Sequence, residues 1–210
     1  MHKAGIVDAI AALLTNRLSP IKRETLWLIS NITAGDQTQI EMIVQANKGD
    51  NRLLLSILHI LDNEHEEESV KKEAVWAIAN ATSGGTPQQI RFICQHNAIY
   101  SLCKYLAACV DRKYYGKVMT VCIEGLENIL SLGLNDALLG GVENANQNQF
   151  LNAVIGQNGA HNLYAMVVEQ HGALESFEAI IENVTDCEEE LRERVQNILD
   201  SYFPFRQFRD

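Results

Sequence analysis

Two stretches of this sequence are close copies of each other, KRETLWLISNITAG at residues 22–35 and KKEAVWAIANATSGG at residues 71–85. Trp27 and Trp76 lie 49 residues apart (76 − 27), and so do Asn31 and Asn80 (80 − 31). A long internal period of this kind is typical of a solenoid, in which each repeat covers the apolar face of the next. The duplication therefore predicts a repeat fold and indicates where a functional surface should be sought.

Amphipathic helical patterns surround both copies in the same order, and no strand pattern of comparable strength occurs. Pro20 is placed for the first turn of one helix, and glycines follow the ends of the copied helices. We expect helices near residues 4–15, 20–33, 38–47, 51–63, 71–83, 87–97, 98–109, 117–133, 160–172, 173–185 and 187–203. The order of these segments predicts three helices in each repeat.

The helical rhythm is expected to stop after Gly133, where Gly140, Gly141 and many Asn and Gln residues indicate an inserted loop with a short helix near residues 150–155. Because Met1 falls inside a repeat, we expect the chain to be a fragment. The predicted divisions are a partial repeat 4–35, repeats 36–85 and 86–134, an insertion 135–158, a capping repeat 159–203 and a tail 204–210.

Composition narrows the class of protein. The net charge of −10, from 17 Lys and Arg against 27 Asp and Glu, disfavours nucleic acid and anionic membranes and favours basic partners, although an acidic surface can also serve solubility alone. No run of ~20 apolar residues is present to span a membrane. The five cysteines have no C-x-x-C pair and stand in apolar helical contexts, which favours buried thiols over disulfides or zinc ligands.

Catalytic motifs are also missing from the sequence. It contains no phosphate-binding glycine loop and no G-x-S-x-G nucleophile elbow. The six histidines show no H-E-x-x-H spacing, and acidic runs such as residues 64–68 are typical of a solvated surface. We therefore expect neither an enzyme nor a cofactor or metal site.

The copied stretches themselves predict a binding surface. In a helix, Glu24, Trp27 and Asn31 stand at i, i+3 and i+7 and share one face, and the second copy repeats this spacing. Asn amides can pair with the main chain of an extended peptide, indoles can pack against Lys or Arg side chains, and the glutamates can bind the cationic groups. This face suits a basic linear peptide.

A purely structural interpretation is also open, because Trp is often a core residue and Asn often caps a helix or joins neighbouring repeats. Two copies in register, each with Glu three residues before the Trp, favour binding. Leu26, Ile29 and Ile32 in the first copy, with Val75 and Ile78 in the second, already supply an apolar face. The indoles are therefore not required for the core.

LWLISNITAG, AVWAIANATSGG and EGLENIL resemble the later armadillo repeats of the importin alpha family, and NLYAMVVEQHGALESFEAI is similar to that family's final repeat. The likeness covers most of residues 5–203, apart from the insertion and a lengthened DNEHEEES turn. It implies an all-α, right-handed armadillo superhelix of about four repeats, the first incomplete. It also implies a nuclear import adaptor that binds nuclear localisation signals.

The resemblance further implies that this chain carries the smaller of the family's two signal-binding sites. The residues that match the site are Glu24, Trp27, Ser30, Asn31, Glu73, Trp76 and Asn80. Alignment on Asn128 puts Glu124 where a third Trp would stand, so the array ends there, with Glu124 and Glu127 as accessory acidic residues. Arg23 stands where the family usually has Lys.

Partners and localisation follow from the same resemblance. It implies cargo proteins with Lys/Arg-rich signals, importin beta through a segment that we expect to be absent here, and shuttling between cytoplasm and nucleus. An export receptor and a nucleoporin would dock near Glu175, Glu178 and Glu182, although the basic, aromatic tail at 204–210 departs from the family. The alternative is an armadillo scaffold that binds a structured protein through another surface.

Overall fold

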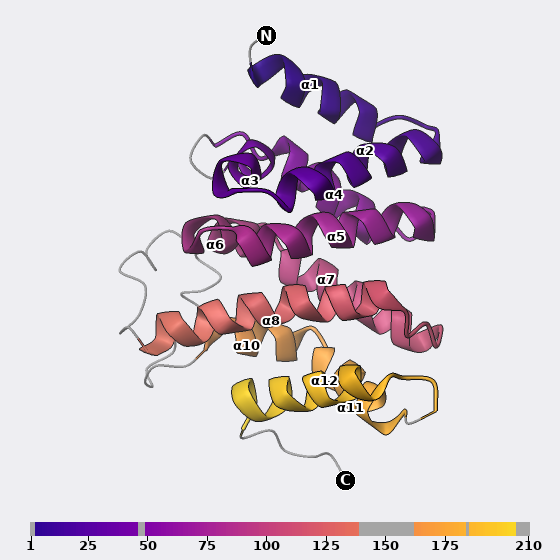
Figure 1. Cartoon of the computed structure of the whole chain (residues 1–210), viewed down its shortest axis with the longest axis vertical. Coiled ribbons are helices and arrows are strands. Elements are labelled where there is room, and N and C mark those ends of the chain that lie inside the picture. Colours follow the sequence, from indigo (N-terminus) through magenta and orange to yellow (C-terminus); the bar gives the residue numbers. More distant parts are fainter. Residues whose placement is uncertain (1–2, 46–48, 139–161, 184, 205–210) are drawn as a thin grey trace. The chain divides into compact units, whose positions relative to one another are not determined.

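The computed structural model describes residues 3–45, 49–138, 162–183 and 185–204, which form α-helices without any strand in these ranges (Figure 1). The all-α prediction is confirmed. The chain divides into two compact units, a first unit of residues 1–105 and a second unit of residues 106–210. The predicted short helix at 150–155, most of the predicted insertion and the tail from residue 205 lie outside the described residues.

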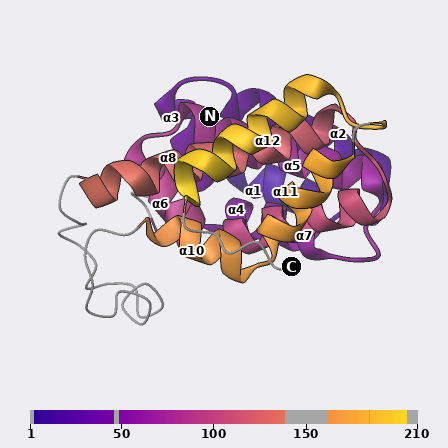
Figure 2. The same ribbon diagram turned by 90° about the horizontal axis from the view of Figure 1, so that it is seen from below.

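The helices follow the order expected from the sequence. The first unit contains α1 (Lys3–Leu14), α2 (Ser19–Thr33), α3 (Gln37–Val44), α4 (Arg52–Asp62), α5 (Glu68–Gly84), α6 (Pro87–Gln95) and the start of α7 (Ala98–Asp111). The second unit contains the rest of α7, α8 (Lys117–Leu138), α10 (Leu163–Gln170), α11 (Ala173–Glu182) and α12 (Glu189–Tyr202). α2 and α5 lie side by side along their lengths, and α11 packs against α12 (Figures 1 and 2).

Two helices of the first unit begin with the same capping box. The Asp36 side chain accepts from the Gln39 N–H at 2.9 Å, and the Gln39 side chain accepts from the Asp36 N–H at 2.8 Å. Thr86 and Gln89 form the same reciprocal pair at the start of α6, at 3.2 and 2.9 Å. Each box provides acceptors for two backbone N–H groups that a helix start otherwise leaves without partners. The starts of α3 and α6 are therefore determined by the local sequence.

The copied stretches contribute apolar side chains to the core of the first unit. Leu26 and Ile29 of α2 and Val75 and Ile78 of α5 are buried, as the sequence predicts for the apolar faces of these helices, while Ile32 is half-buried. Burying a side chain of this size contributes roughly 1.5–3 kcal/mol. These buried side chains help to set α2 beside α5.

A largely buried ion pair also positions α2. The Lys22 ammonium contacts the Glu66 carboxylate, and the two side chains are only 15% and 6% exposed. Glu66 lies in the turn between α4 and α5, so the pair ties the start of α2 to the start of α5. Because both groups have left water, each depends on the other for compensation of its charge.

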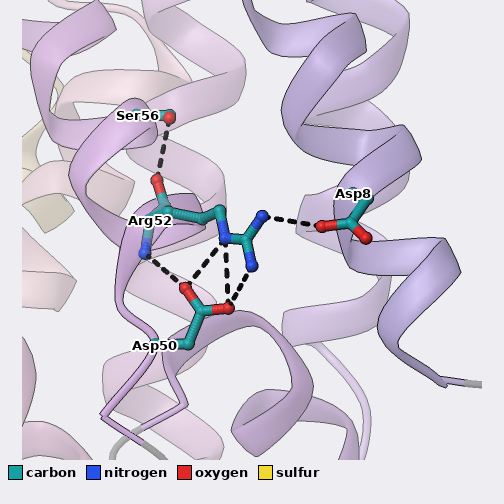
Figure 3. A network of polar contacts seen from close by, with 4 residues as sticks. All are labelled: Asp8, Asp50, Arg52 and Ser56. Atoms are coloured by element: carbon teal, nitrogen blue, oxygen red, sulfur yellow. Dashed lines mark hydrogen bonds and ion pairs between the residues drawn. The ribbon is translucent and has the colours of Figure 1, made fainter.

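A second ionic network joins α1 to α4 at the surface (Figure 3). Arg52 donates from Nη1 to Asp8 at 2.6 Å and from Nη2 to Asp50 at 2.7 Å. Hydrogen bonding by the Arg52 guanidinium lowers the pKa of Asp50, and the same bond raises the pKa of Arg52. Ser56 donates to the Arg52 carbonyl at 2.8 Å, which adds a local bond at the start of α4.

In the second unit, α8 corrects one prediction. The helix does not end at Gly133 but continues to Leu138, past residue 135, where the inserted loop was expected to begin. A Cβ at Gly133 would lie 2.1 Å from Oδ1 of Asn162, whose Nδ2 donates to the Leu130 carbonyl at 2.8 Å. Gly133 therefore serves the close approach of Asn162 to α8 and is not a helix terminator.

Candidate peptide-binding site on α2 and α5

The two tryptophans stand on neighbouring helices of the first unit. Trp27 lies on α2 with 56% of its surface exposed, and Trp76 lies on α5 and is half-buried. The neighbours Leu26 and Val75 are buried. Since α2 and α5 pack along their lengths, the packing brings the two copies of the motif onto adjacent helices.

The asparagines use one amide hydrogen each within the fold. Asn31 Nδ2 donates to the Trp27 carbonyl of its own helix at 2.8 Å, whereas Asn80 Nδ2 donates across to the Ser30 carbonyl of α2 at 3.0 Å. Asn80 thus joins the two helices, which is the structural role considered for it in the sequence. The hydrogen bonds found for both amides within the described part of the chain involve Nδ2, and none of them uses an Oδ1 acceptor.

Ser30 contributes its backbone more than its side chain. It is buried, and its Oγ donates to the Trp27 carbonyl at 2.8 Å, the same oxygen that Asn31 uses. The Ser30 carbonyl is the acceptor for Asn80. The Ser30 carbonyl thus anchors Asn80, while the Ser30 hydroxyl is engaged within α2.

The acidic residues of the site already interact with a cation of the chain. Arg23 donates to the Glu24 carboxylate from Nη2 at 2.8 Å and from Nε at 3.2 Å, and this contact raises the pKa of Arg23. Burial raises the pKa of Glu73, Arg23 opposes that shift, and the charge of Glu24 adds to it. Glu24, Glu73 and Arg23 therefore form one electrostatic group, with two carboxylates for one guanidinium.

The accessory acidic residues lie on α8, in the second unit. Glu124 and Glu127 are both ion-paired to Arg194 of α12, at 2.8 and 2.7 Å. Asn128 is half-buried on the same helix. Arg194 is not among the site residues predicted from the sequence, because no local pattern links it to residues 124–127.

The described residues also bear on metal sites, reactive cysteines and membrane-spanning helices. They contain no group of three His, Cys, Asp or Glu side chains that could hold a metal ion. The five cysteines are free thiols, and burial raises the pKa of Cys103 to about 12, which keeps it protonated and unreactive. Over the same ranges, no helix combines the length and apolar character that crossing a bilayer needs.

The known proteins that the chain resembles in sequence include several importin alpha subunits of plants. The chain is 36% identical to importin subunit alpha-4 of Arabidopsis thaliana, over 91% of the chain and 30% of that protein. It is 36% identical to importin subunit alpha-1b of Oryza sativa subsp. japonica, over 96% of the chain and 40% of that protein. The chain thus spans 30% to 40% of the length of these relatives. No family model matches the chain.

Two solved structures with a similar fold are designed armadillo repeat proteins. A designed armadillo repeat protein in complex with the peptide (KR)4 matches 95% of this chain and 82% of its own, with a TM-score of 0.53 and 24% identity. A second designed armadillo repeat protein matches 94% of this chain and 82% of its own, with a TM-score of 0.51 and 23% identity. At this level of identity the likeness concerns the fold, and it confirms the expected armadillo-repeat architecture.

Proposed function

Since the chain is an armadillo-repeat relative of the importin alpha subunits, we propose that it belongs to a nuclear import adaptor and binds Lys/Arg-rich nuclear localisation peptides across α2 and α5. The observation that carries the proposal is the exposed indole of Trp27 on α2, a helix that packs against α5, which carries the matching Trp76. A large aromatic surface left in water next to carboxylates suits a basic side chain with a long apolar stem.

In the proposed complex, the peptide main chain donates to Oδ1 of Asn31 and Asn80. Both amides are held by bonds from their Nδ2 atoms, so the acceptors are oriented before the ligand arrives. Lys or Arg stems pack against the indoles, and each cation over a Trp face contributes about 0.5–2 kcal/mol. Glu24 and Glu73 bind the cationic ends, in competition with Arg23.

The same proposal extends to the cellular role of the chain and to its further partners. As part of an adaptor related to importin alpha, the chain would act as a non-enzymatic scaffold that shuttles between cytoplasm and nucleus, with importin beta bound by another part of the protein. The acidic α11, which carries Glu175, Glu178 and Glu182, is the proposed place for an export receptor or a nucleoporin.

The test measures binding of the peptide (KR)4 by calorimetry and by the fluorescence of the two indoles. Trp27→Ala combined with Trp76→Ala should reduce affinity at least tenfold, since two cation–π contacts of ~1 kcal/mol each are lost. Leu55→Ala is the matched control, because Leu55 is an exposed apolar residue of α4 outside the site. If the double variant binds as well as the parent, the peptide site is elsewhere and the scaffold alternative takes its place.

A further inference from the structure

The first two helices of the chain expose an apolar surface at one end of the first unit. On α1, Ile6 and Leu13 are 38% and 43% exposed, and Leu28 of α2 is 45% exposed. Ala9 and Ala12 of α1 are exposed as well. Because positions 6, 9 and 13 follow the helical period, these residues share one face of α1. The five residues together are called the end surface, and none of them is charged.

The next repeat buries the positions that correspond to the end surface. α4 repeats the burial pattern of α1 at an offset of 47 residues (53 − 6), so that Leu53 and Ile60 match Ile6 and Leu13. Leu53 and Ile60 are 0% and 5% exposed, and Ala77 of α5, at the place of the exposed leucine of α2, is 1% exposed.

The order of the helices explains this difference between the two repeats. α4 packs against α1 and α5 packs against α2, whereas no described helix of the first unit lies before α1 (Figure 1). In a solenoid each repeat covers the apolar face of its neighbour. The end surface is therefore a repeat face of the kind that a further layer of helices covers.

The distribution of charge favours a second copy of the chain as this layer. Residues 3–35 hold four cationic and two anionic side chains, although the net charge of the whole chain is −10. The acid of α1, Asp8, is already paired with Arg52 at 2.6 Å. Two copies therefore repel each other least where their end surfaces meet.

The last helix of the second unit provides a contrast. The exposed residues of α12 are all polar, and they include Glu193, Asn197 and Asp200. An apolar surface finds no match on such a helix, which disfavours an open head-to-tail chain of copies. The end surface matches itself, as a two-fold dimer requires.

We propose that two copies of the chain associate head to head, so that the end surface of each covers that of the other. α1 and α2 are 12 and 15 residues long. A surface two helices wide then measures roughly 20 by 20 Å, or about 400 Å² on each copy. This area is at the low end for specific contacts, so we expect a dissociation constant on the order of 100 µM.

The experiment is sedimentation velocity of the 210-residue chain under reducing conditions, from about 5 to 500 µM, where mass action makes a weak dimer visible. Leu13→Glu should weaken the dimer about tenfold or more, because it brings two carboxylates into an apolar contact. Leu55→Glu is the matched control, since Leu55 is 45% exposed on α4 and lies outside the end surface. Ala12→Glu serves in place of Leu13→Glu if circular dichroism shows that the latter does not fold.

Cross-linking tests the head-to-head arrangement. Ala9 lies in the middle of the exposed face of α1, so Ala9→Cys should form a disulfide-linked dimer with oxidised glutathione more readily than Leu55→Cys. A parent chain that stays monomeric up to the highest concentration would overturn the inference and leave the end surface to another protein. Equal dimerisation by Leu13→Glu and Leu55→Glu, or preferential cross-linking through Leu55→Cys, would also overturn it.

This inference goes beyond the proposed function and does not depend on it. It concerns residues other than the two indoles, and each measurement is made without peptide. Loss of (KR)4 binding therefore leaves the dimer untouched, and a monomeric parent leaves the peptide site untouched.

Discussion

Nδ2 of Asn80 donates to the backbone carbonyl of Ser30 at 3.0 Å, so a side chain of α5 closes a hydrogen bond on the main chain of α2. Asn31, the equivalent residue of the first copy, instead bonds the Trp27 carbonyl within its own helix. Two residues at the same place in the repeat thus contribute differently to the fold.

Asn80→Ala should consequently lower the free energy of unfolding by about 0.5–1.5 kcal/mol, because the bond between α5 and α2 is lost. Asn31→Ala is the matched control and should cost less, since Asn31 is exposed and its bond stays within α2. Urea denaturation followed by circular dichroism measures both variants. Equal destabilisation by the two substitutions would contradict the distinction.

Removal of Arg23 should strengthen binding of (KR)4. Arg23 holds the Glu24 carboxylate at 2.8 Å, and Arg23→Ala releases it to the ligand. An exposed ion pair of this kind corresponds to about a two- to fivefold change in affinity. Arg17→Ala removes an equal charge from an exposed position before α2 and should change affinity less. A weaker complex with Arg23→Ala would show that Arg23 itself contacts the peptide.

Glu73→Gln should stabilise the chain near neutral pH. The folded state raises the pKa of Glu73, chiefly through burial, so its ionised form is less favourable there than in the unfolded chain. For such a group, stability is fully present below the unfolded pKa and is lost as pH rises through the folded pKa. The advantage of the variant should therefore be largest near pH 7 and shrink as pH falls towards about 4.

Denaturant midpoints of the parent and of Glu73→Gln across this pH range provide the measurement. Glu182→Gln, at an exposed carboxylate of α11, is the control and should show no such trend. The same Glu73→Gln chain should bind (KR)4 more weakly, since it lacks one of the proposed carboxylates. A chain that is both less stable and a better binder would argue against this account of Glu73.

Lys22→Met should be strongly destabilising, by about 3 kcal/mol, because it leaves the Glu66 carboxylate buried without its counter-ion. Lys22→Met combined with Glu66→Gln should recover part of that loss, since no uncompensated charge remains. Arg52→Ala, at the exposed network of Figure 3, should cost much less. Additive effects of the substitutions at Lys22 and Glu66 would show that the two residues do not interact.

Gly133→Ala and Gly5→Ala should have opposite effects on stability, although both glycines lie in helices. A Cβ at Gly133 meets Asn162 at 2.1 Å, whereas nothing lies within 4 Å of one at Gly5. The first change should therefore destabilise by about 1–3 kcal/mol, and the second should stabilise by up to ~1 kcal/mol. Thermal unfolding of the two variants checks the pair.

Much of this fold could be predicted, because its helices are encoded locally. Apolar spacing, the prolines at 20 and 87 and the glycines at 35 and 85 place the helices without knowledge of the tertiary structure. The exception is Gly133, where a terminator was expected and a packing contact with Asn162 is found. A glycine that ends a helix and one that admits a neighbour look alike in a single sequence.

The candidate site was predictable only in its residue types. The copied motif located Trp27 and Trp76, but the partners of their neighbours depend on contacts that spacing does not encode. Arg194 is 70 residues from Glu124 in the sequence, and Asn80 meets a backbone oxygen that carries no sequence signal of its own. Charge balance at a surface therefore has to come from the folded structure.

The two capping boxes have a consequence for engineering. Gly35 precedes the box of Asp36, and Gly85 precedes the box of Thr86, so both junctions have the same order of glycine followed by a self-contained helix start. Residues 36–85 can thus be treated as a cassette: a second copy inserted after Gly85 would create a junction of native type. Such a chain would gain one more copy of the Trp76 and Asn80 motif in register, which offers a way to lengthen the proposed peptide site by duplication alone.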